Sequence, residues 1–174
     1  MPCVEGKTRY SVEGKKLEVP LSKEEFDYGV TKGKFCKKKH KAFAVLLYYS
    51  GLRKTELRRA KREQFSEESG RLIFAVGKRL KHGKETESLQ FPLSLPYMSL
   101  VMDAINSTKK TAKVFDFSDR TAYNVIRRVW HYPHHFRLTR ITKEFQKGRT
   151  IPEMKNFTGL TLQALDSYVG KVSI

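Results

Sequence analysis

Long apolar segments are missing from this chain of 174 residues. No run of about 18 or more apolar residues occurs, and the N-terminal sequence MPCVEGKTRY lacks the apolar region of a secretory signal. Membrane-spanning and secreted proteins are therefore excluded as first interpretations. We expect a soluble, cytoplasmic protein that makes no membrane contact.

Cysteine is also scarce, since Cys3 and Cys36 are the only two in the sequence. Neither belongs to a CxxC pattern or has a histidine at zinc-finger spacing, so a metal or redox centre is not expected, although one disulfide stays open. The sequence has no GxxxxGK[ST] pattern and no acidic cluster for two metal ions. We therefore expect neither a metal nor a small-molecule cofactor.

Acidic side chains are the third shortage. The 18 Asp and Glu residues stand against 35 Lys and Arg, which gives a formal net charge of +17. Such an excess is typical of proteins that bind nucleic acid, acidic lipid or acidic protein, and charge alone does not choose among them. Hydrophobic residues make up 39% of the chain and aromatic residues 11%, which is enough for one core in one domain.

Capping residues and hydrophobic spacing predict mostly helices. Ser22 and Glu25 form a capping box that starts the first helix, and a buried central helix over 37–50 ends at Gly51. Gly148 closes a later helix. Beyond the central helix, further helices are predicted over the ranges 54–62, 96–107, 118–130, 134–146, 152–157 and 162–169.

The spacing between these helices changes to that of strands. Alternating apolar residues predict a β-hairpin over 71–93, with Val76 opposite Leu89 and the turn at His82-Gly83. A short strand near 64–66 would add a third member to the sheet.

These elements predict an α+β fold class that is mainly α-helical, with a small antiparallel sheet. Residues 1–20 are expected to be a lead-in arm, and residues 21–174 one domain.

Three separated segments combine residue types suited to a phosphodiester. Arg53 follows the central helix, His134 and Arg137 share one helix face, and Tyr168 lies near the C-terminus. Two guanidinium groups would bind the nonbridging oxygens and stabilise a pentacoordinate transition state. A tyrosine would be the covalent nucleophile, His134 its base, and a hairpin lysine the acid for the leaving oxygen.

Each of these residues alone has a simpler interpretation. Arg53 alone is more often a helix-end or surface arginine, His134 a structural histidine, and Tyr168 a half-buried core residue. Hairpin lysines alone are typical of a solvated turn. Only the joint spacing favours a site for phosphodiester chemistry.

At these positions the chain resembles the catalytic domain of the tyrosine recombinases, also called phage-type integrases. The segment GLRKTEL (51–57) is similar to the family's first box, G-L-R-x-S/T-E-L. The segment HHFRLT (134–139) is similar to the second box, H-x-L-R-H-T, with Phe136 for Leu and Leu138 for His. The resemblance extends over roughly residues 20–170, and it implies the catalytic-domain fold of this family.

The resemblance implies roles for the residues in the two boxes. Arg53 and Arg137 would bind the scissile phosphate, and His134 would accept or donate a proton beside it. Tyr168 falls where the family's nucleophile is expected. It would attack the phosphate to form a 3′-phosphotyrosyl link and release a 5′-hydroxyl.

The family lysine is ambiguous in this sequence. The segments 83–84 and 91–93 resemble the lysine-bearing hairpin of the family. Counting back from the second of these segments favours Lys84, and counting forward from the first box favours Lys78, with Lys81 between them. Hairpin register does not separate these choices.

One position departs from the family pattern. Gly159 stands where a His or Trp usually precedes the nucleophile, and a glycine has no side chain to donate a hydrogen bond. Lys155 or another group would substitute, or activity would be weaker. The chain also has little room for the N-terminal DNA-clamping domain of many members, so we expect an isolated catalytic domain.

The resemblance implies a site-specific recombinase or integrase that acts on double-stranded DNA as a homo-oligomer, a tetramer, with residues 168–174 as a candidate protomer contact. It implies a nucleoid-associated protein of prokaryotic, viral or plasmid origin. Two alternatives stay open: a type IB topoisomerase-like nicking and closing enzyme, and a catalytically weakened DNA-binding module. A generic RNA-binding protein is disfavoured because no RNP-type signature occurs.

Overall fold

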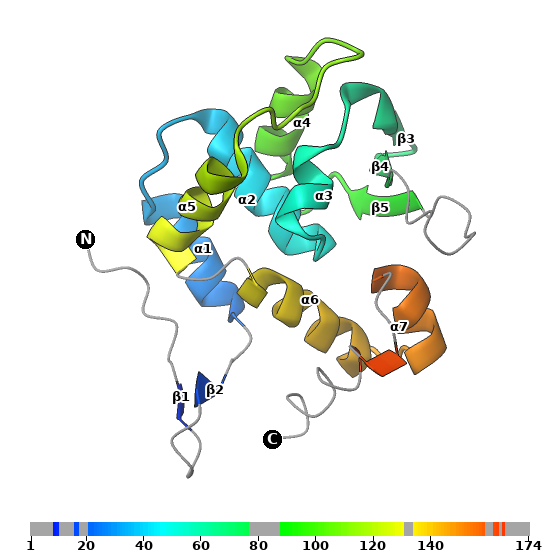
Figure 1. The fold of residues 1–174 in the computed structure, drawn as a ribbon. Coiled ribbons are helices and arrows are strands. Elements are labelled where there is room, and N and C mark those ends of the chain that lie inside the picture. Colours follow the sequence, from blue (N-terminus) through cyan, green and yellow to red (C-terminus); the bar gives the residue numbers. More distant parts are fainter. Residues whose placement is uncertain are drawn as a thin grey trace.

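The computed structural model describes residues 9–10, 16–17, 21–76, 88–130, 134–158, 162–163 and 165. Figure 1 shows a mainly helical chain with a small sheet on one side. The helices are α1 (Lys23–Lys32), α2 (Lys38–Ser50), α3 (Lys54–Arg58), the 3-10 turn η1 (Arg62–Gln64), α4 (Met98–Asn106), α5 (Asp119–Trp130), α6 (His134–Gln146) and α7 (Ile151–Thr158). The strands are β1 (Arg9–Tyr10), β2 (Lys16–Leu17), β3 (Phe65–Glu68), β4 (Arg71–Ala75) and β5 (Ser88–Pro92).

The capping box predicted at the first helix is present. The Ser22 hydroxyl accepts a hydrogen bond from the Glu25 N–H at 3.1 Å, and the Glu25 carboxylate accepts one from the Ser22 N–H at 3.0 Å. These two bonds satisfy backbone donors that a helix start leaves unpaired. The helix therefore begins where the sequence predicts.

Helix α2 is the centre of the core, as its apolar composition predicts. Every residue from Ala42 to Tyr48 is buried, and α2 packs against α3, α4, α5 and α6 (Figure 1). Gly51 ends this helix in the left-handed conformation, with φ of +64°. A glycine adopts this conformation without steric cost, so it is a natural end for the helix.

Strands β3, β4 and β5 form a three-stranded antiparallel sheet in that order. The third strand predicted near 64–66 is confirmed as β3, but the predicted hairpin register is wrong. Phe74, not Val76, lies opposite Leu89. A shift by two residues leaves every side chain on the same face, so alternation alone does not distinguish the two registers. The predicted turn at His82-Gly83 lies outside the described residues.

Helix α3 is shorter than the predicted range 54–62, because its continuation makes backbone contacts elsewhere. The Arg62 N–H donates to the Ala112 carbonyl at 2.9 Å, and the Glu63 N–H donates to the Lys110 carbonyl at 3.0 Å. The Val114 N–H in turn donates to the Ala60 carbonyl at 3.1 Å. This pairing takes the place of helical hydrogen bonds beyond Ala60.

The remaining predicted helices agree closely with the structure over the described residues. Helix α6 spans the predicted 134–146, and Gly148 follows it with φ of +86°. Helix α4 begins later than predicted, at Met98, because Tyr97 before it has φ of +66°. Of the predicted range 162–169, the described residues 162–163 and 165 are helical.

The fold class predicted from the sequence, mainly α-helical with a small antiparallel sheet, is confirmed. The division into an arm over 1–20 and a domain over 21–174 stays a prediction. Within the described ranges, no helix is both long enough and apolar enough to cross a membrane.

Candidate functional site

The corner between α2 and α3 presents the first predicted site residue. The Gly51 N–H donates to the Leu47 carbonyl at 3.0 Å, which completes the end of α2. Leu52 is buried, and Arg53 has the extended backbone of a helix N-cap, with φ of −69° and ψ of 145°. The buried Leu52 side chain therefore holds the corner in the core, while the Arg53 side chain is exposed.

Helix α6 brings the second predicted arginine against this corner. The Arg137 guanidinium donates from Nη1 to the Gly51 carbonyl at 3.0 Å, and the same nitrogen lies 4.0 Å from the Glu56 carboxylate. The Arg137 side chain is only 6% exposed. A buried guanidinium needs such partners because desolvation of an unpaired charge is costly.

Glu56 contacts both predicted arginine segments. Its carboxylate oxygen Oε1 accepts a hydrogen bond from the Arg53 backbone N–H at 3.3 Å and is the oxygen that lies near Arg137. One carboxylate therefore links the start of α3 to α6. No hydrogen bond or ion pair joins the Arg53 guanidinium itself to another residue in the described ranges.

The other predicted site residues are not tested by this geometry. Helix α6 begins at His134, three residues before Arg137, but the His134 side chain lies outside the described part of the chain. Lys78, Lys84 and Tyr168 also lie outside the described residues, as do Lys81 and Gly159. Lys155 is exposed on α7. The roles of these residues stay predictions.

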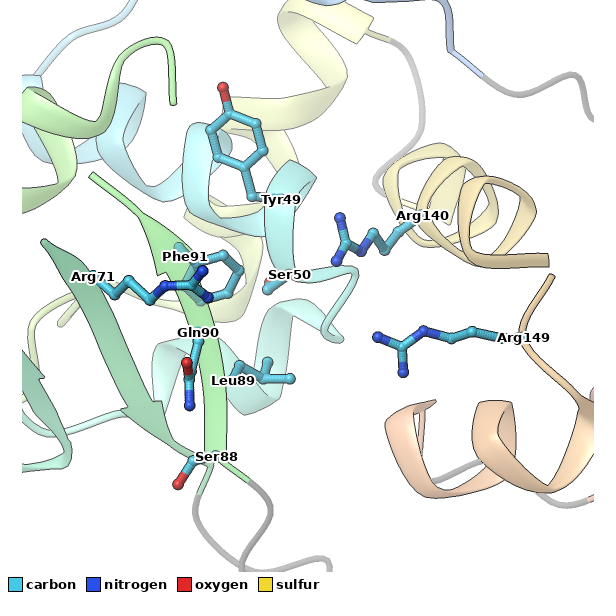
Figure 2. A pocket seen from close by; sticks show the side chains of 9 residues that line it. All are labelled: Tyr49, Ser50, Arg71, Ser88, Leu89, Gln90, Phe91, Arg140 and Arg149. Atoms are coloured by element: carbon cyan, nitrogen blue, oxygen red, sulfur yellow. The ribbon is translucent and has the colours of Figure 1, made fainter. Parts of the chain in front are cut away.

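A cleft of about 290 Å³ lies beside the corner, lined by β4, β5, the end of α2, α6 and the connection that follows α6. Three arginines from separate elements, Arg71, Arg140 and Arg149, line it (Figure 2). The remaining lining residues are polar or apolar without charge: Tyr49, Ser50, Ser88, Leu89, Gln90 and Phe91. The cleft is therefore a cationic surface.

A buried carboxylate lies behind two of these arginines. Glu144 is 1% exposed, and its oxygens lie 2.9 Å from Arg140 Nη2 and 2.5 Å from Arg149 Nε. Lys147 Nζ approaches the same carboxylate at 3.3 Å. Burial lowers the pKa of the Arg140 guanidinium, and Arg149 lowers it further, while Glu144 opposes both effects.

Tyr49 lines the cleft but is not suited to be a nucleophile there. Its hydroxyl donates to the Pro96 carbonyl at 2.7 Å, and Figure 2 shows it directed away from the arginines. Burial is the main cause that raises the pKa of Tyr49 to about 12. The hydroxyl therefore remains protonated at neutral pH, and its proton is already donated in a structural hydrogen bond.

Sequence reasoning gives no role to Glu56 or to the arginines of the cleft. Glu56 is part of the first box, and a carboxylate three residues after a helix N-cap is a recognised capping signal. Arg140 follows Arg137 by three residues, and Glu144 follows Arg140 by four, so the predicted helix places these residues near one another. The approach of Arg71 and Arg149 depends on tertiary packing and has no local signal.

A scan against protein-family models and a search of curated protein sequences both find no match. Among solved structures, the chain is similar to XerA recombinase, with 18% identity and a TM-score of 0.66 over 93% of this chain and 60% of that chain. It is also similar to the XerH site-specific recombinase bound to difH substrate, with 15% identity and a TM-score of 0.64 over 94% of this chain and 56% of that chain.

A third similar structure is the Tn1549 transposon integrase in complex with a circular intermediate DNA, with 15% identity and a TM-score of 0.62 over 88% of this chain and 62% of that chain. The chain therefore has a tyrosine recombinase-like fold, as its two boxes predict. It spans 56 to 62% of the length of these three proteins.

Proposed function

We propose that the chain is a catalytic domain of a tyrosine-type, site-specific DNA recombinase or integrase. The observation that supports this most directly is the contact of Arg137 with the Gly51 carbonyl at 3.0 Å, because it joins the two boxes in a recombinase-like fold. The solved XerH and Tn1549 integrase structures contain DNA. The net charge of +17 is consistent with a polyanionic partner.

In the proposed reaction, the Tyr168 oxygen attacks a backbone phosphorus and forms a 3′-phosphotyrosyl bond. The bond from phosphorus to the 5′ oxygen breaks, and His134 takes the tyrosine proton. Lys84 or Lys78 donates a proton to the departing oxygen, which becomes a 5′-hydroxyl. Attack by a 5′-hydroxyl on the phosphotyrosine reverses these steps and rejoins the strand.

Arg53 and Arg137 would stabilise the charge that develops on the nonbridging oxygens. Their environments differ. Arg137 is buried and oriented by Gly51 and Glu56, so its position is set before DNA binds. The Arg53 guanidinium is exposed at the corner and is accessible to a phosphate.

A trapped covalent adduct tests this proposal. Duplexes that bind tightly are selected from a random pool and are nicked near each candidate phosphate, so that the released 5′-hydroxyl fragment diffuses away. The wild-type chain is expected to give a protein–DNA adduct on a denaturing gel, and Tyr168→Phe none. Tyr28→Phe, which changes an exposed tyrosine on α1, is the matched control and keeps the adduct. Equal behaviour of wild type and Tyr168→Phe would contradict the proposal.

The same substrates separate the alternatives. Relaxation of supercoiled plasmid without sequence preference or recombinant products would indicate a topoisomerase-like enzyme. Tight, salt-sensitive binding without any adduct would indicate a DNA-binding module. Since one such site cleaves one strand, exchange between two duplexes would take four protomers, and the mass of the complex on DNA measures this number.

A further inference from the structure

The convergence of Arg71, Arg140 and Arg149 on one cleft calls for a ligand of opposite charge. The three side chains come from β4, α6 and the connection between α6 and α7. Figure 2 shows Arg71 extending from β4 toward β5, and Arg140 and Arg149 on the other side of the cleft. None of the described residues that line the cleft is acidic. Three guanidinium groups repel one another, so this arrangement favours a bound anion.

Arg71 is a cation that is accessible from the cleft. Its side chain is exposed, and its guanidinium makes no hydrogen bond or ion pair with another residue in the described part of the chain. This guanidinium is therefore available to an anion that enters the cleft.

Glu144 orients the other two arginines before any ligand arrives. It contacts Arg140 at 2.9 Å and Arg149 at 2.5 Å from a position that is almost completely buried. Guanidinium groups that are already held in place lose less conformational entropy when they bind an anion. The arrangement is typical of a preorganised anion site.

The uncharged lining residues favour a phosphate with several acceptor oxygens. The Gln90 amide and the Ser88 hydroxyl line the cleft wall and are hydrogen-bond donors. Planar guanidinium forks match phosphate oxygens through paired hydrogen bonds. A cleft of about 290 Å³ has room for a phosphate together with an attached sugar.

The cleft borders the proposed catalytic groups. Ser50 directly precedes Gly51, whose carbonyl binds Arg137, and Arg140 lies three residues after Arg137 on α6. We propose that Arg71, Arg140 and Arg149 form a second phosphate site, which binds a DNA backbone phosphate other than the one that is cleaved. This inference rests on the proposed function, and it assigns these arginines to substrate positioning rather than to the reaction.

The site is tested by neutralising single DNA phosphates and combining each change with a protein variant. One duplex selected for binding is made with single neutral methylphosphonate linkages, and Kd is measured for wild type and for Arg71→Gln/Arg149→Gln. Wild type is expected to lose affinity by about tenfold at one linkage outside the cleaved position. The double variant is expected to bind the unmodified duplex about tenfold more weakly than wild type. The methylphosphonate at that linkage should then lower the affinity of the double variant by less than about a further twofold. The slope of log Kd against log salt concentration should be smaller by about 1 for the double variant than for wild type.

Matched controls distinguish this site from general loss of charge. Arg59→Gln/Arg120→Gln removes two exposed arginines outside the cleft, and it is expected to keep the full sensitivity to that linkage. Arg71→Gln alone leaves the Glu144 contacts intact and gives a partial loss of sensitivity, and circular dichroism checks the folding of each variant. Equal sensitivity of wild type and Arg71→Gln/Arg149→Gln at every linkage would overturn the proposal.

Inorganic phosphate distinguishes the two sources of a phosphate group. If the arginines bind inorganic phosphate but show no coupling to any DNA linkage, the site takes a free anion and the DNA assignment is overturned. Adduct formation is scored on the same duplexes. A normal adduct without coupling refutes the second phosphate site alone, whereas coupling without an adduct supports this site and refutes the proposed catalysis.

Discussion

Gly51 is the residue at which the two boxes meet. Its φ of +64° ends α2, and its carbonyl accepts the hydrogen bond from Arg137. A Cβ at this position would lie 2.7 Å from both Cβ and Cγ of Arg140. These atoms are at the base of the side chain, so α6 itself would have to move to make room.

Replacement of Gly51 by alanine is therefore expected to affect stability more than replacement of a glycine in open space. Gly51→Ala should lower the free energy of unfolding by about 3 kcal/mol, of which about 1–2 kcal/mol is left-handed backbone strain. Gly70→Ala is the matched control, because Gly70 has φ of +72° and nothing within 4 Å of the added carbon. Gly70→Ala should lower the free energy of unfolding only by the contribution of left-handed backbone strain. Urea denaturation measures both, and equal losses would contradict a close approach of α6 to Gly51.

At the scale of elements, local signals predict helix ends well. The capping box of Ser22 and Glu25 and the left-handed Gly51 act on neighbours along the chain, so α1 and α2 begin or end within a residue or so of the predicted positions. The early end of α3 has no such signal. It results from backbone pairing of Arg62 and Glu63 with residues 110–112, which are far away in sequence.

The same distinction holds for the candidate site. The spacing of His134, Arg137 and Arg140 on one helix follows from the sequence, because a helix repeats every 3.6 residues. The contact of Arg137 with Gly51 spans 86 residues, and the cleft adds Arg71 from the sheet. Residue spacing along one helix or strand does not predict contacts between different elements, because these contacts depend on how the elements pack.

The register between β4 and β5 gives a prediction at this scale. Ala75 lies opposite Ser88, whereas the register predicted from alternation pairs Ala75 with Gln90. In a Cys3→Ser/Cys36→Ser background, Ala75→Cys/Ser88→Cys should form a disulfide, because opposite Cα atoms in a sheet are about 4.5–5.5 Å apart. Ala75→Cys/Gln90→Cys is the control and should stay reduced, since diagonal pairs are about 7–8 Å apart. Non-reducing mass spectrometry reads the result, and the opposite outcome would favour the register from alternation.

At the scale of the whole molecule, the cations behind the net charge of +17 have different environments. Some cations are held by protein partners: Asp119 contacts Lys54 at 2.6 Å and Arg58 at 3.4 Å. The hydrogen bond from Lys54 lowers the pKa of the Asp119 carboxyl. Lys37 and Lys38, at the start of α2, are exposed instead. Exposed cations of this kind are suited to sequence-independent phosphate contacts along a flanking duplex.

Two sets of variants should therefore separate affinity from chemistry. Lys37→Gln/Lys38→Gln is expected to weaken DNA binding about tenfold and to reduce the salt slope by about 1–2, because phosphate contacts release counterions. Its adduct rate at saturating DNA should equal that of wild type. Arg53→Gln should instead lower that rate by about 100-fold or more while most of the affinity remains, because in the proposed reaction its guanidinium would stabilise the developing charge of one phosphate. Single-turnover adduct formation and salt titrations of Kd measure the two effects. A large loss of rate at saturating DNA in Lys37→Gln/Lys38→Gln would contradict the separation, since it would mean that remote cations take part in the chemical step.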